Sequence, residues 1–360
     1  MNKNIGIVKL YCGQSGKIGF YNSQEIGEAK AFLKKGYNSY VFICSKENKT
    51  VIEKDIEGIK VFFCPGISIG VHGKFDWNIL LQYKIDIIQI NSDNQFFVGN
   101  LVRFCKKNNI NYYCYIGTIS VTTNSNIKRF ISGLFIKKNL SIYKQSKCFS
   151  KTEFVQKELK TNKINSILAP VGLDTTIIPF LDDNKNDTKT KLRIPLDKKI
   201  LLFVGRLEEY KDPLSIIEVI KNMSDSYAIV IGSGSLSNEL VTKIKKEKLE
   251  KSFRLIEEIA NKEIHNYYAI ADYFLNFNKN EIFGMSILEA MYQGCNAIAI
   301  DAPGPRTIIN NGIDGFIVED VNNMRNIVIE NKKCNSKLIK ERITNNFTWD
   351  ATVKTIIDNL

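Results

Sequence analysis

The residues best suited to chemistry lie in the second half of the chain. Gly205, Arg206 and Lys211 follow an apolar run at 200–204 that is typical of a buried strand. A planar, forked cation and a mobile ammonium at the carboxyl end of a strand suit the two phosphates of a diphosphate. Two solvated basic residues that open a helix are the alternative, and the position of the Gly-Arg pair directly after the strand argues against it.

Two carboxylates, Glu281 and Glu289, flank Gly284 after a second predicted strand at 273–276. We expect Glu281 in a loop above a helix that begins near Gly284 and carries Glu289. Free N–H groups and the helix dipole favour an anion at such a helix N-terminus. The alternatives are an exposed loop acid for Glu281 and a capping box, Ser286-x-x-Glu289, for Glu289.

Small residues follow two other predicted strands. The turn after strand 228–231 would let a nucleotide approach the backbone, although such turns are common in α/β folds. The segment 13–19 follows the first strand and precedes a helix, where backbone N–H groups can meet a phosphate. It matches neither a Walker A loop nor G-x-G-x-x-G, so phosphate or acceptor contact and a plain turn both stay open. The residues concerned are Gly16, Lys17, Gly19, Gly232 and Gly234.

The histidines and cysteines predict no metal centre. The chain has two histidines and eight cysteines, without a Cys-x-x-Cys pair, so a zinc site is not expected. The cysteines lie mostly in apolar runs, which favours buried, reduced thiols in a cytosolic protein. His265 lies on an apolar helical face and is interpreted as structural. His72, between Gly70 and Gly73, is a candidate for the acceptor side.

Short apolar runs alternate with amphipathic helical patterns along the whole chain, which predicts an α/β fold. The expected strands are 5–10, 40–44, 59–64, 85–90, 112–116, 167–169, 200–204, 228–231, 253–256, 273–276, 297–300 and 315–318; expected helices include 24–35, 96–107 and 127–138. The polar run 181–190 interrupts this pattern and indicates a boundary. Two doubly wound domains are therefore expected, with ligands at the carboxyl ends of their strands and in the cleft between them.

The charge is divided unequally between the two halves. Residues 1–180 contain 25 Lys and Arg against 12 Asp and Glu, whereas residues 181–360 contain 25 against 26. The first half is therefore expected to meet nucleic acid, a membrane surface or a phosphorylated substrate. No transmembrane or signal segment is expected, and we predict a cytoplasmic protein, peripheral on the inner face of the membrane if it docks there.

One helix localises the basic character of the first half. Apolar residues of 127–135 recur on one helical face, and lysines and arginines surround that face up to position 147. This pattern predicts an interfacial basic helix on an anionic membrane. Packing of the apolar stripe on the N-terminal sheet and binding of an anionic acceptor in solution are the alternatives. The stripe consists of Ile127, Phe130, Ile131, Leu134 and Phe135.

Taken together, these motifs resemble glycosyltransferase family 4. The resemblance rests on Gly205-Arg206-Leu207 with Lys211, on Glu281-x-Phe283-Gly284 with Glu289, and on Gly294 and the stretch 301–316. It implies a GT-B fold, in which two Rossmann-like domains face each other across a cleft. Residues 1–175 would form the acceptor-side domain and 176–347 the nucleotide-sugar-binding domain, with a closing helix at 348–360 that packs back on the first.

The resemblance also implies a metal-independent, retaining hexosyl transfer without a cofactor. Arg206 and Lys211 would neutralise the leaving diphosphate, and Glu281 would hold hydroxyls of the donor sugar. Glu289 would accept from the ribose hydroxyls, while Gly16 would lie near the donor phosphate and the acceptor. The implied donor set is Gly16, Gly205, Arg206, Lys211, Gly232, Gly234, Glu281, Phe283, Gly284, Met285, Ser286 and Glu289; the acceptor-side candidates are Lys17, Gly19, His72, Gly117 and Thr118.

Two departures from the family pattern concern the transferred sugar. Gly117 and Thr118 stand where many members carry a histidine, and Thr307, beside Arg306, stands in place of a frequent glutamate. The implied donor is a nucleoside-diphosphate sugar, with UDP favoured over GDP and ADP. The implied acceptor is a glycan or lipid-linked glycan of bacterial surface polysaccharide or glycoconjugate synthesis.

Other functions stay open at the level of the sequence. A GT-B epimerase or phosphorylase is the enzymatic alternative, although no lysine is marked for pyridoxal phosphate. A nucleic-acid-binding protein is the non-enzymatic one, prompted by the basic first half. No helix-turn-helix, aromatic RNP-like strand or zinc module supports it, so no nucleic-acid partner is expected.

Overall fold

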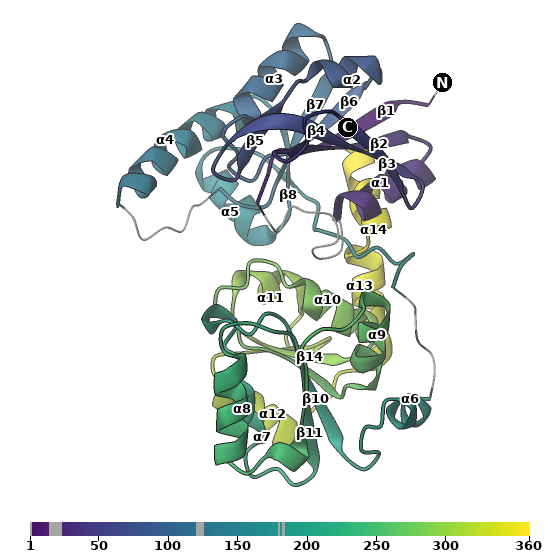
Figure 1. Ribbon diagram of the computed structural model, residues 1–360, viewed down its shortest axis with the longest axis vertical. Helices are drawn as coiled ribbons and strands as arrows, with labels where there is room; N and C mark the ends of the chain where they lie inside the picture. The colour runs from purple at the N-terminus through teal and green to yellow at the C-terminus, as the bar shows by residue number, and fades with distance from the viewer. Residues whose placement is uncertain (1, 14–23, 120–125, 179–180, 182–183) are drawn as a thin grey trace. The chain divides into compact units, whose positions relative to one another are not determined.

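The computed structural model describes residues 2–13, 24–119, 126–178, 181 and 184–360. The chain forms two compact units (Figure 1). The first unit contains Met1–Asp174 together with Trp349–Leu360, and the second contains Thr175–Thr348. Each unit is an α/β structure built on one mainly parallel sheet, as the alternation of strand and helix patterns predicts.

The first unit is built on a nine-stranded sheet with β1 in its interior. The strand order is β3-β4-β2-β1-β6-β7-β8-β9, with β5 paired to β4. Among the strands that the structure describes here, only the pairs β3·β4 and β4·β5 are antiparallel. The strands are β1 (Asn4–Lys9), β2 (Asn38–Ser45), β3 (Ile52–Ile56), β4 (Ile59–Ile69), β5 (His72–Phe75), β6 (Ile87–Asn91), β7 (Asn111–Ile116), β8 (Lys147–Ser150) and β9 (Ile167–Leu168).

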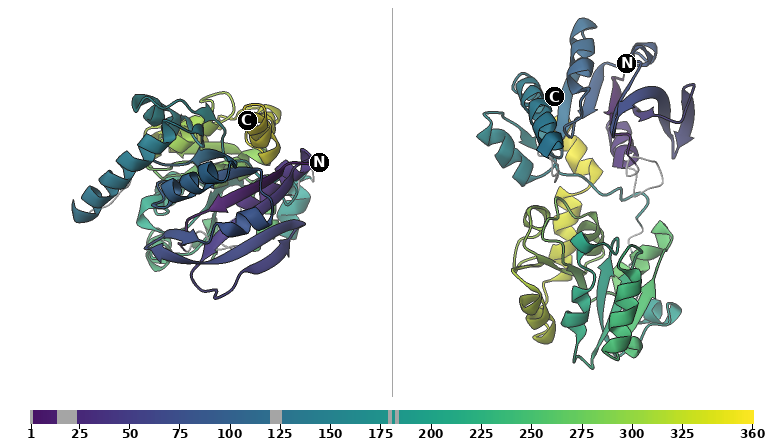
Figure 2. Two further views of the ribbon diagram at one scale, coloured as in Figure 1. Left: turned by 90° about the horizontal axis from the view of Figure 1, so that it is seen from above. Right: turned by 60° about the vertical axis from the view of Figure 1, so that its left-hand side comes forward.

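Six helices of the described part belong to this unit: α1 (Gln24–Lys34), α2 (Asn78–Gln82), α3 (Val98–Lys107), α4 (Asn126–Tyr143), α5 (Glu153–Thr161) and α14 (Trp349–Ile357). The last of them comes from the C-terminus and lies alongside α1 (Figures 1 and 2). Trp349 N donates to Leu173 O at 3.2 Å, and a Cβ atom at Gly27 would lie 2.6 Å from the Trp349 ring. A glycine on α1 therefore allows the close approach of the C-terminal helix.

The second unit has a six-stranded sheet in the order β12-β11-β10-β13-β14-β15. All of its paired strands run parallel. The strands are β10 (Lys199–Val204), β11 (Ser226–Ile231), β12 (Phe253–Ile256), β13 (Tyr273–Asn276), β14 (Asn296–Ile300) and β15 (Phe316–Val318). This is the 3-2-1-4-5-6 order of the Rossmann fold, and its direction reverses between β10 and β13. Ligands of such sheets bind at this switch point, beyond the carboxyl ends of the strands.

The helices of the second unit are α6 (Lys185–Lys191), α7 (Ser215–Ile220), α8 (Ser237–Lys246), α9 (Asn261–Ile270), α10 (Met285–Tyr292), α11 (Pro303–Ile308), α12 (Val321–Ile329) and α13 (Ser336–Asn346), with short 3-10 helices η2 (Glu209–Lys211) and η3 (Glu250–Ser252). We expected the polar run 181–190 to interrupt the regular elements, but helix α6 begins within it, at Lys185. The Asn184 side chain accepts from Asn186 N and caps this helix. Capping by a polar residue thus stabilises a helix with little apolar surface.

All of the expected strands are present, but three strands of the first unit were not predicted. These are β3, β5 and β8. Among the residues that the structure describes, no helix combines the length and the apolar character that crossing a bilayer requires.

Candidate active site

The switch point of the second unit brings the predicted cation and carboxylate together. Lys211 lies in η2 after β10, and Glu281 lies in the loop after β13, its parallel neighbour. The Lys211 Nζ atom is 2.5 Å from Glu281 Oε2. The side chains are 21% and 12% exposed, so the pair is largely shielded from water. This burial excludes the alternative interpretation of Glu281 as an exposed loop acid.

Two asparagines, one at the end of β13 and one in the loop that follows it, support the Glu281 carboxylate. Asn278 Nδ2 lies 3.2 Å and Asn276 Nδ2 3.5 Å from Glu281 Oε2. The Asn276 side chain in turn accepts from Asn278 N at 3.1 Å. Asn276 is the last residue of β13, so the end of the strand orients the carboxylate. These polar strand-end residues are a signal that the sequence analysis did not use.

Arg206 lies at the carboxyl end of β10 and is exposed. Its guanidinium carbon is 5.3 Å from the centre of the Tyr210 ring, and Lys211 Nζ is 5.5 Å from the same centre. A cation over an aromatic face is attracted by the ring quadrupole. Tyr210 therefore holds the two predicted diphosphate ligands near each other, a role that the sequence analysis missed.

Gly232 and Gly234, in the turn after β11, pack against the backbone of residues 205–207. A Cβ atom at Gly232 would lie 2.0 Å from Gly205 O, and one at Gly234 would lie 2.4 Å from Leu207 O. Leu207 N also donates to Ser233 O at 2.9 Å. The two strand-end loops are packed so closely that side chains are excluded, which gives both glycines a packing role beside the predicted nucleotide contact.

Helix α10 begins without a capping side chain. Gly284 is its N-cap residue, with φ +104°, and Met285 is its first residue. Ser286 therefore lies inside the first turn, so the proposed capping box with Glu289 is wrong. The positive φ explains the glycine, because other residues are strained in this conformation. The structure thus leaves the N-terminus of α10 without a side-chain cap.

The loop before α10 is anchored on α11. Gly304 N donates to Glu281 O at 2.7 Å, and a Cβ atom at Gly304 would lie 2.3 Å from Phe283 O. One of the two departures from the family pattern, Thr307 beside Arg306, also lies on α11. Thr307 is buried and donates through Oγ1 to Pro303 O, while Arg306 forms a two-point ion pair with Asp301.

Glu289 is buried between α10 and α9. It is 4% exposed and accepts a hydrogen bond of 2.8 Å from the Tyr268 hydroxyl. His265, one turn before Tyr268, is also buried, and burial lowers its pKa to about 4. A neutral histidine packed against a tyrosine agrees with the structural interpretation. The ribose role of Glu289 stays a prediction.

The first unit gathers charged groups at the carboxyl edge of its own sheet. Gly117, which follows β7, donates through its backbone N to Asp93 Oδ1 at 2.5 Å. Lys151, directly after β8, lies 2.9 Å from Asp93 Oδ2 and 4.9 Å from the centre of the Tyr115 ring. Burial acts to lower the pKa of Lys151, but the carboxylates around it, first Asp93, raise it overall.

Asp93 and Lys151 therefore stand beside Gly117, the position where the family pattern has a histidine. The sequence analysis missed both residues. It predicted no strand before Lys151, and Asp93 lies three residues beyond the predicted end of its strand. The rule that polar residues gather at the ends of parallel strands would have found them once the strand order was known.

His72 lies in a stack of three rings. Its ring centre is 3.7 Å from that of Phe96, which is 3.8 Å from that of Phe135 on α4. His72 Nδ1 is 3.1 Å from Gln95 Oε1, and burial lowers the pKa of the imidazole. Gly16, Lys17 and Gly19 lie outside the described residues.

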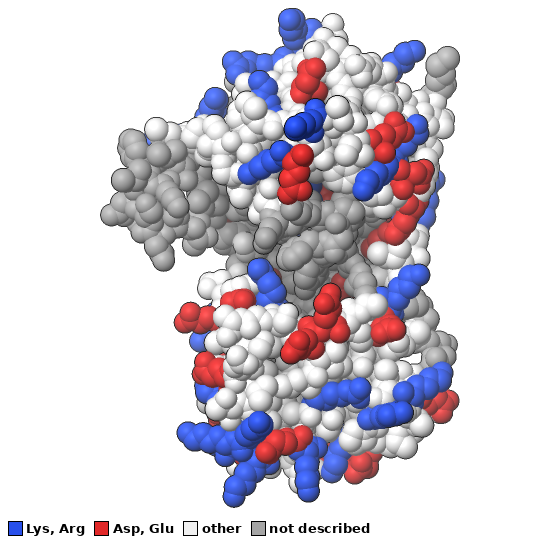
Figure 3. All heavy atoms as spheres, in the orientation of Figure 1, with Lys and Arg blue, Asp and Glu red and all other residues white. Residues whose placement is uncertain are grey.

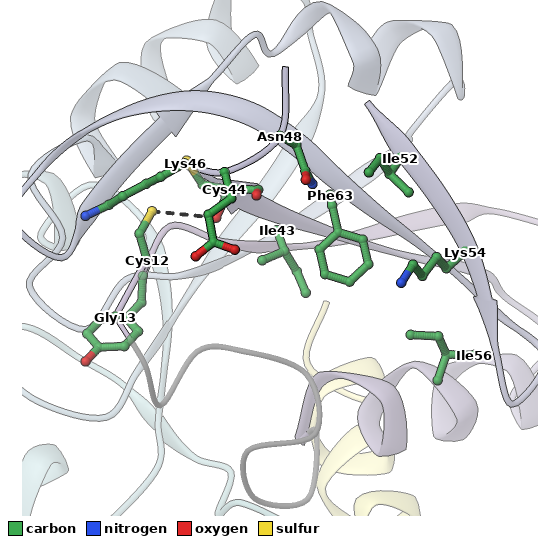
Figure 4. A pocket seen from close by; sticks show the side chains of 13 residues that line it. Cys12, Gly13, Ile43, Cys44, Lys46, Asn48, Ile52, Lys54, Ile56 and Phe63 are labelled. Carbon is green, nitrogen blue, oxygen red and sulfur yellow. Dashed lines mark hydrogen bonds between the residues drawn. The ribbon is translucent and has the colours of Figure 1, made fainter. Parts of the chain in front are cut away.

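A cavity of about 340 Å³ opens at the carboxyl ends of β1 and β2 (Figure 4). Its lining combines an apolar part with a polar part that carries two lysines. The lining residues are Tyr11, Cys12, Gly13, Ile43, Cys44, Ser45, Lys46, Glu47, Asn48, Ile52, Lys54, Ile56 and Phe63. Within the described ranges, no group of three or more His, Cys, Asp or Glu side chains is placed to hold a metal ion.

Comparison with known proteins connects this geometry to a family. Residues 184–333 match the model of the family described as "Glycosyl transferases group 1". The UDP-Gal:alpha-D-GlcNAc-diphosphoundecaprenol alpha-1,3-galactosyltransferase of Escherichia coli is 25% identical over 346 residues, 88% of this chain and 87% of that protein. The 2-deoxystreptamine N-acetyl-D-glucosaminyltransferase of Niallia circulans is 31% identical over 146 residues, 39% of this chain and 36% of that protein.

Solved structures share the architecture of the whole chain. Sucrose-phosphate synthase from Thermosynechococcus elongatus superposes with a TM-score of 0.72 at 16% identity, covering 99% of this chain and 98% of that one. Anabaena HepE, solved in complex with UDP and glucose, gives 0.71 at 14% identity, covering 99% of both chains. The fold expected from the resemblance, GT-B, is therefore confirmed. Residues 184–333 therefore form a domain of the glycosyl transferases group 1 family, and the chain as a whole is similar to glycosyltransferases of the family 4 type.

Proposed function

We propose that this chain transfers a hexose from a UDP-sugar to a glycan or a lipid-linked glycan, with retention of the anomeric configuration. The observation that carries the proposal is the shielded Lys211–Glu281 pair at the switch point, beside Arg206. The Escherichia coli relative is named for a UDP-galactose donor and a diphosphoundecaprenol-linked acceptor, and Anabaena HepE was solved with UDP and glucose. Both support a UDP-sugar as donor.

The ion pair suggests how the donor is received. The diphosphate meets Arg206 and Lys211, and the Lys211 ammonium exchanges its Glu281 contact for phosphate oxygens. The Glu281 carboxylate, still oriented by Asn278, then accepts hydroxyls of the sugar. As the sugar–phosphate bond breaks, negative charge grows on the diphosphate, and the two cations stabilise it without a metal ion.

A donor panel tests the proposal. Purified protein is incubated with UDP-, GDP- and ADP-sugars, and both thermal stabilisation and slow nucleotide release are measured. We expect UDP-sugars to stabilise the wild type and to be hydrolysed slowly, and Lys211→Met to abolish both effects. Lys245→Met, on an exposed face of α8, is the matched control and should behave as the wild type. Absence of any nucleotide-sugar effect, or an effect that Lys211→Met leaves intact, would contradict the proposal.

We place the acceptor in the cavity at the ends of β1 and β2. Its volume lies in the range of small-molecule sites, and its mixed lining suits a sugar with polar edges and apolar faces. Ile52→Trp should fill it from the exposed edge strand β3 and raise the KM for the acceptor, with donor hydrolysis unchanged. Val51→Trp, its exposed neighbour outside the cavity, is the control. Equal acceptor KM values in both variants would place the acceptor elsewhere.

An anionic membrane is the proposed peripheral partner of the first unit. Residues 94–152 contain ten Lys and Arg and no Asp or Glu. Basic side chains gather over α3 at the upper end of Figure 3. Arg103, Lys106 and Lys138 line a groove of about 320 Å³ between α3 and α4. A bilayer with anionic headgroups complements such a basic segment.

Leu134 and Phe135, two residues of the apolar stripe on the predicted interfacial helix, differ in their surroundings. Leu134 is 55% exposed, but Phe135 stacks on Phe96. Phe135 thus packs on a side chain of the first unit that lies outside its sheet, and is not available to a membrane surface. The proposed membrane contact consequently rests on the lysines and on Leu134, and less on a continuous apolar face.

A further inference from the structure

Two thiols meet at the wall of the cavity in the first unit (Figure 4). Cys12 follows β1, and Cys44 lies in the neighbouring strand β2. A Cβ atom built on Gly73 would lie 2.2 Å from Cys12 Sγ and 2.6 Å from Cys44 Sγ. The two sulfur atoms, on either side of that point, are therefore at most 4.8 Å apart. Two sulfur atoms this near to each other meet the first geometric requirement of a disulfide, which is that the two thiols approach closely.

Backbone pairing holds the two sulfurs in this position. Gly73 N donates to Leu10 O at 2.7 Å, and Cys12 N donates to Val71 O at 2.8 Å. The start of β5 thus bridges to the chain just beyond β1, and the absence of a side chain at Gly73 leaves room for both thiols. Any larger residue at position 73 would force the sulfurs apart.

The surroundings divide the roles of the two thiols. The Cys12 thiol lies 3.6 Å from Cys44 O, to which it donates. A side-chain hydrogen bond with Cys44 lowers the pKa of Cys12 against the opposing effect of burial, and the Lys46 ammonium lowers it further. The same hydrogen bond, together with burial, raises the pKa of Cys44. Cys12 is partly exposed and Cys44 is buried. Cys12 is thus the accessible nucleophile and Cys44 the resolving thiol.

We propose that Cys12 and Cys44 form a redox-active dithiol that a hydroperoxide entering the cavity oxidises to an intramolecular disulfide. The Cys12 thiolate attacks one peroxide oxygen, the O–O bond breaks, and Cys12 becomes a sulfenic acid as hydroxide or alkoxide leaves. The Cys44 sulfur then attacks the Cys12 sulfur. The S–O bond breaks, and the departing hydroxide takes the Cys44 proton as water. Two electrons pass from the sulfurs to the peroxide, and an external thiol restores the dithiol by exchange.

A second cysteine pair of the same unit provides an internal comparison. Cys114 and Cys148 face each other in the register of β7 and β8. Both are buried, and the hydrogen bond with Cys148, together with burial, raises the pKa of Cys114. We expect this second pair to stay reduced, because a peroxide has no access to either thiol.

Oxidation followed by peptide mapping tests the proposal. The reduced full chain is treated with hydrogen peroxide, free thiols are alkylated, and disulfides are mapped by mass spectrometry with and without dithiothreitol. We expect a Cys12–Cys44 disulfide that dithiothreitol reverses, with Cys114 and Cys148 still reduced. Cys44→Ser should instead accumulate a Cys12 sulfenic acid that dimedone traps, and Cys114→Ser, the matched control, should form the disulfide as the wild type does.

Two further variants separate proximity from thiolate stabilisation. Gly73→Ala should prevent the disulfide by displacing the sulfurs, provided that its circular dichroism spectrum is unchanged. Lys46→Met should shift the pH profile of Cys12 alkylation to higher pH while the disulfide still forms. A Cys12 that stays alkylatable after peroxide, or equal oxidation of the Cys114–Cys148 pair, would overturn the proposal. None of these measurements uses sugar transfer, so their outcome is independent of the proposed function.

Discussion

The two units share one strand order but differ in charge. In each, the first strand lies inside the sheet: the parallel run β4-β2-β1-β6 of the first unit corresponds to β12-β11-β10-β13 of the second. The first unit contains 26 Lys and Arg against 14 Asp and Glu, a net charge of +12, whereas the second contains 24 of each. The same scaffold therefore carries different charged groups in the two units, and the loops that follow the strands determine which groups lie at the strand ends.

In the second unit, the two cations at the strand ends each contact a carboxylate or an aromatic ring of the same unit. Lys211 pairs with Glu281, and Arg206 and Lys211 share the Tyr210 ring. In the first unit, Asp93 and Lys151 form a similar pair, and the sequence between them contains nine other Lys and Arg and no Asp or Glu. The comparison suggests that the second unit handles one compact anion, the donor diphosphate, and that the first meets a larger anionic surface.

The largest expected effect tests whether diphosphate neutralisation belongs to the second unit. Arg206→Ala should lower turnover at least about 100-fold, as for the loss of one donor that stabilises transition-state charge. Arg325→Ala, at a half-buried arginine of α12 that donates to Glu218 O, is the control and should retain wild-type turnover. Steady-state kinetics with excess EDTA complete the test. Loss of activity in EDTA, with rescue by manganese, would show that a metal does this work.

The two units should respond to pH in opposite directions. Burial raises the pKa of Glu28 on α1 from 4.5 to about 8, so the unfolded first unit holds fewer protons between these values and stability falls as pH rises. Burial lowers the pKa of His265 on α9 from 6.5 to about 4, so stability of the second unit is lost as pH falls through this window. Over two pH units, each effect is on the order of 2 kcal/mol.

Amide hydrogen exchange, corrected for the intrinsic exchange rate, measures the pH dependence of stability separately for α1 and α9. Protection of α1 should decrease from pH 5 to 7, and protection of α9 should decrease from pH 6.5 to 4.5. Glu28→Gln should remove the first dependence and leave the second unchanged. Parallel pH profiles of α1 and α9 in the wild type would refute the assignment to these two groups.

Charge reversal tests the contrast in surface charge. Each cation near an anionic bilayer contributes about 1 kcal/mol, so Lys137→Glu/Lys138→Glu should weaken vesicle binding by about 30-fold or more. Lys245→Glu/Lys246→Glu on α8 makes the same change in net charge on the second unit and should bind as the wild type. Sedimentation with phosphatidylglycerol vesicles measures both, and binding should weaken as salt rises. Equal binding to phosphatidylcholine vesicles, or equal losses in both variants, would refute membrane docking by the first unit.

The smallest effect distinguishes the two carboxylates of the second unit. Glu281→Gln should lower turnover about tenfold, the lower end for a hydrogen bond to a charged group, with UDP affinity nearly unchanged. Glu289→Gln should mainly weaken UDP binding, measured by calorimetry. Tyr268→Phe is the control for the buried contact, because it removes only the hydroxyl that Glu289 accepts from. Equal losses of UDP affinity in the two Gln variants would contradict separate roles.

Local patterns predicted much of this molecule because regular elements depend on neighbouring residues. Apolar runs located every parallel strand of the second unit. The strands that were missed lack such runs: β3 is Ile-Glu-Lys-Asp-Ile, largely exposed at the sheet edge, while β5 and β8 have four residues each. Pairing with β4 and β7 stabilises these strands. The residue pattern of a single segment carries no information about which strand it will pair with.

The sequence by itself determined the α/β class, most of the elements and the motif residues Arg206, Lys211, Glu281 and Glu289. The tertiary structure alone decided which of them meet. Strand order joined Lys211 to Glu281, 70 positions apart, and Lys151 to Asp93, and it brought Cys12 beside Cys44. It also buried Glu289 against Tyr268. Such contacts depend on which strands become neighbours, and parallel neighbours are joined by long crossovers, so no local spacing encodes them.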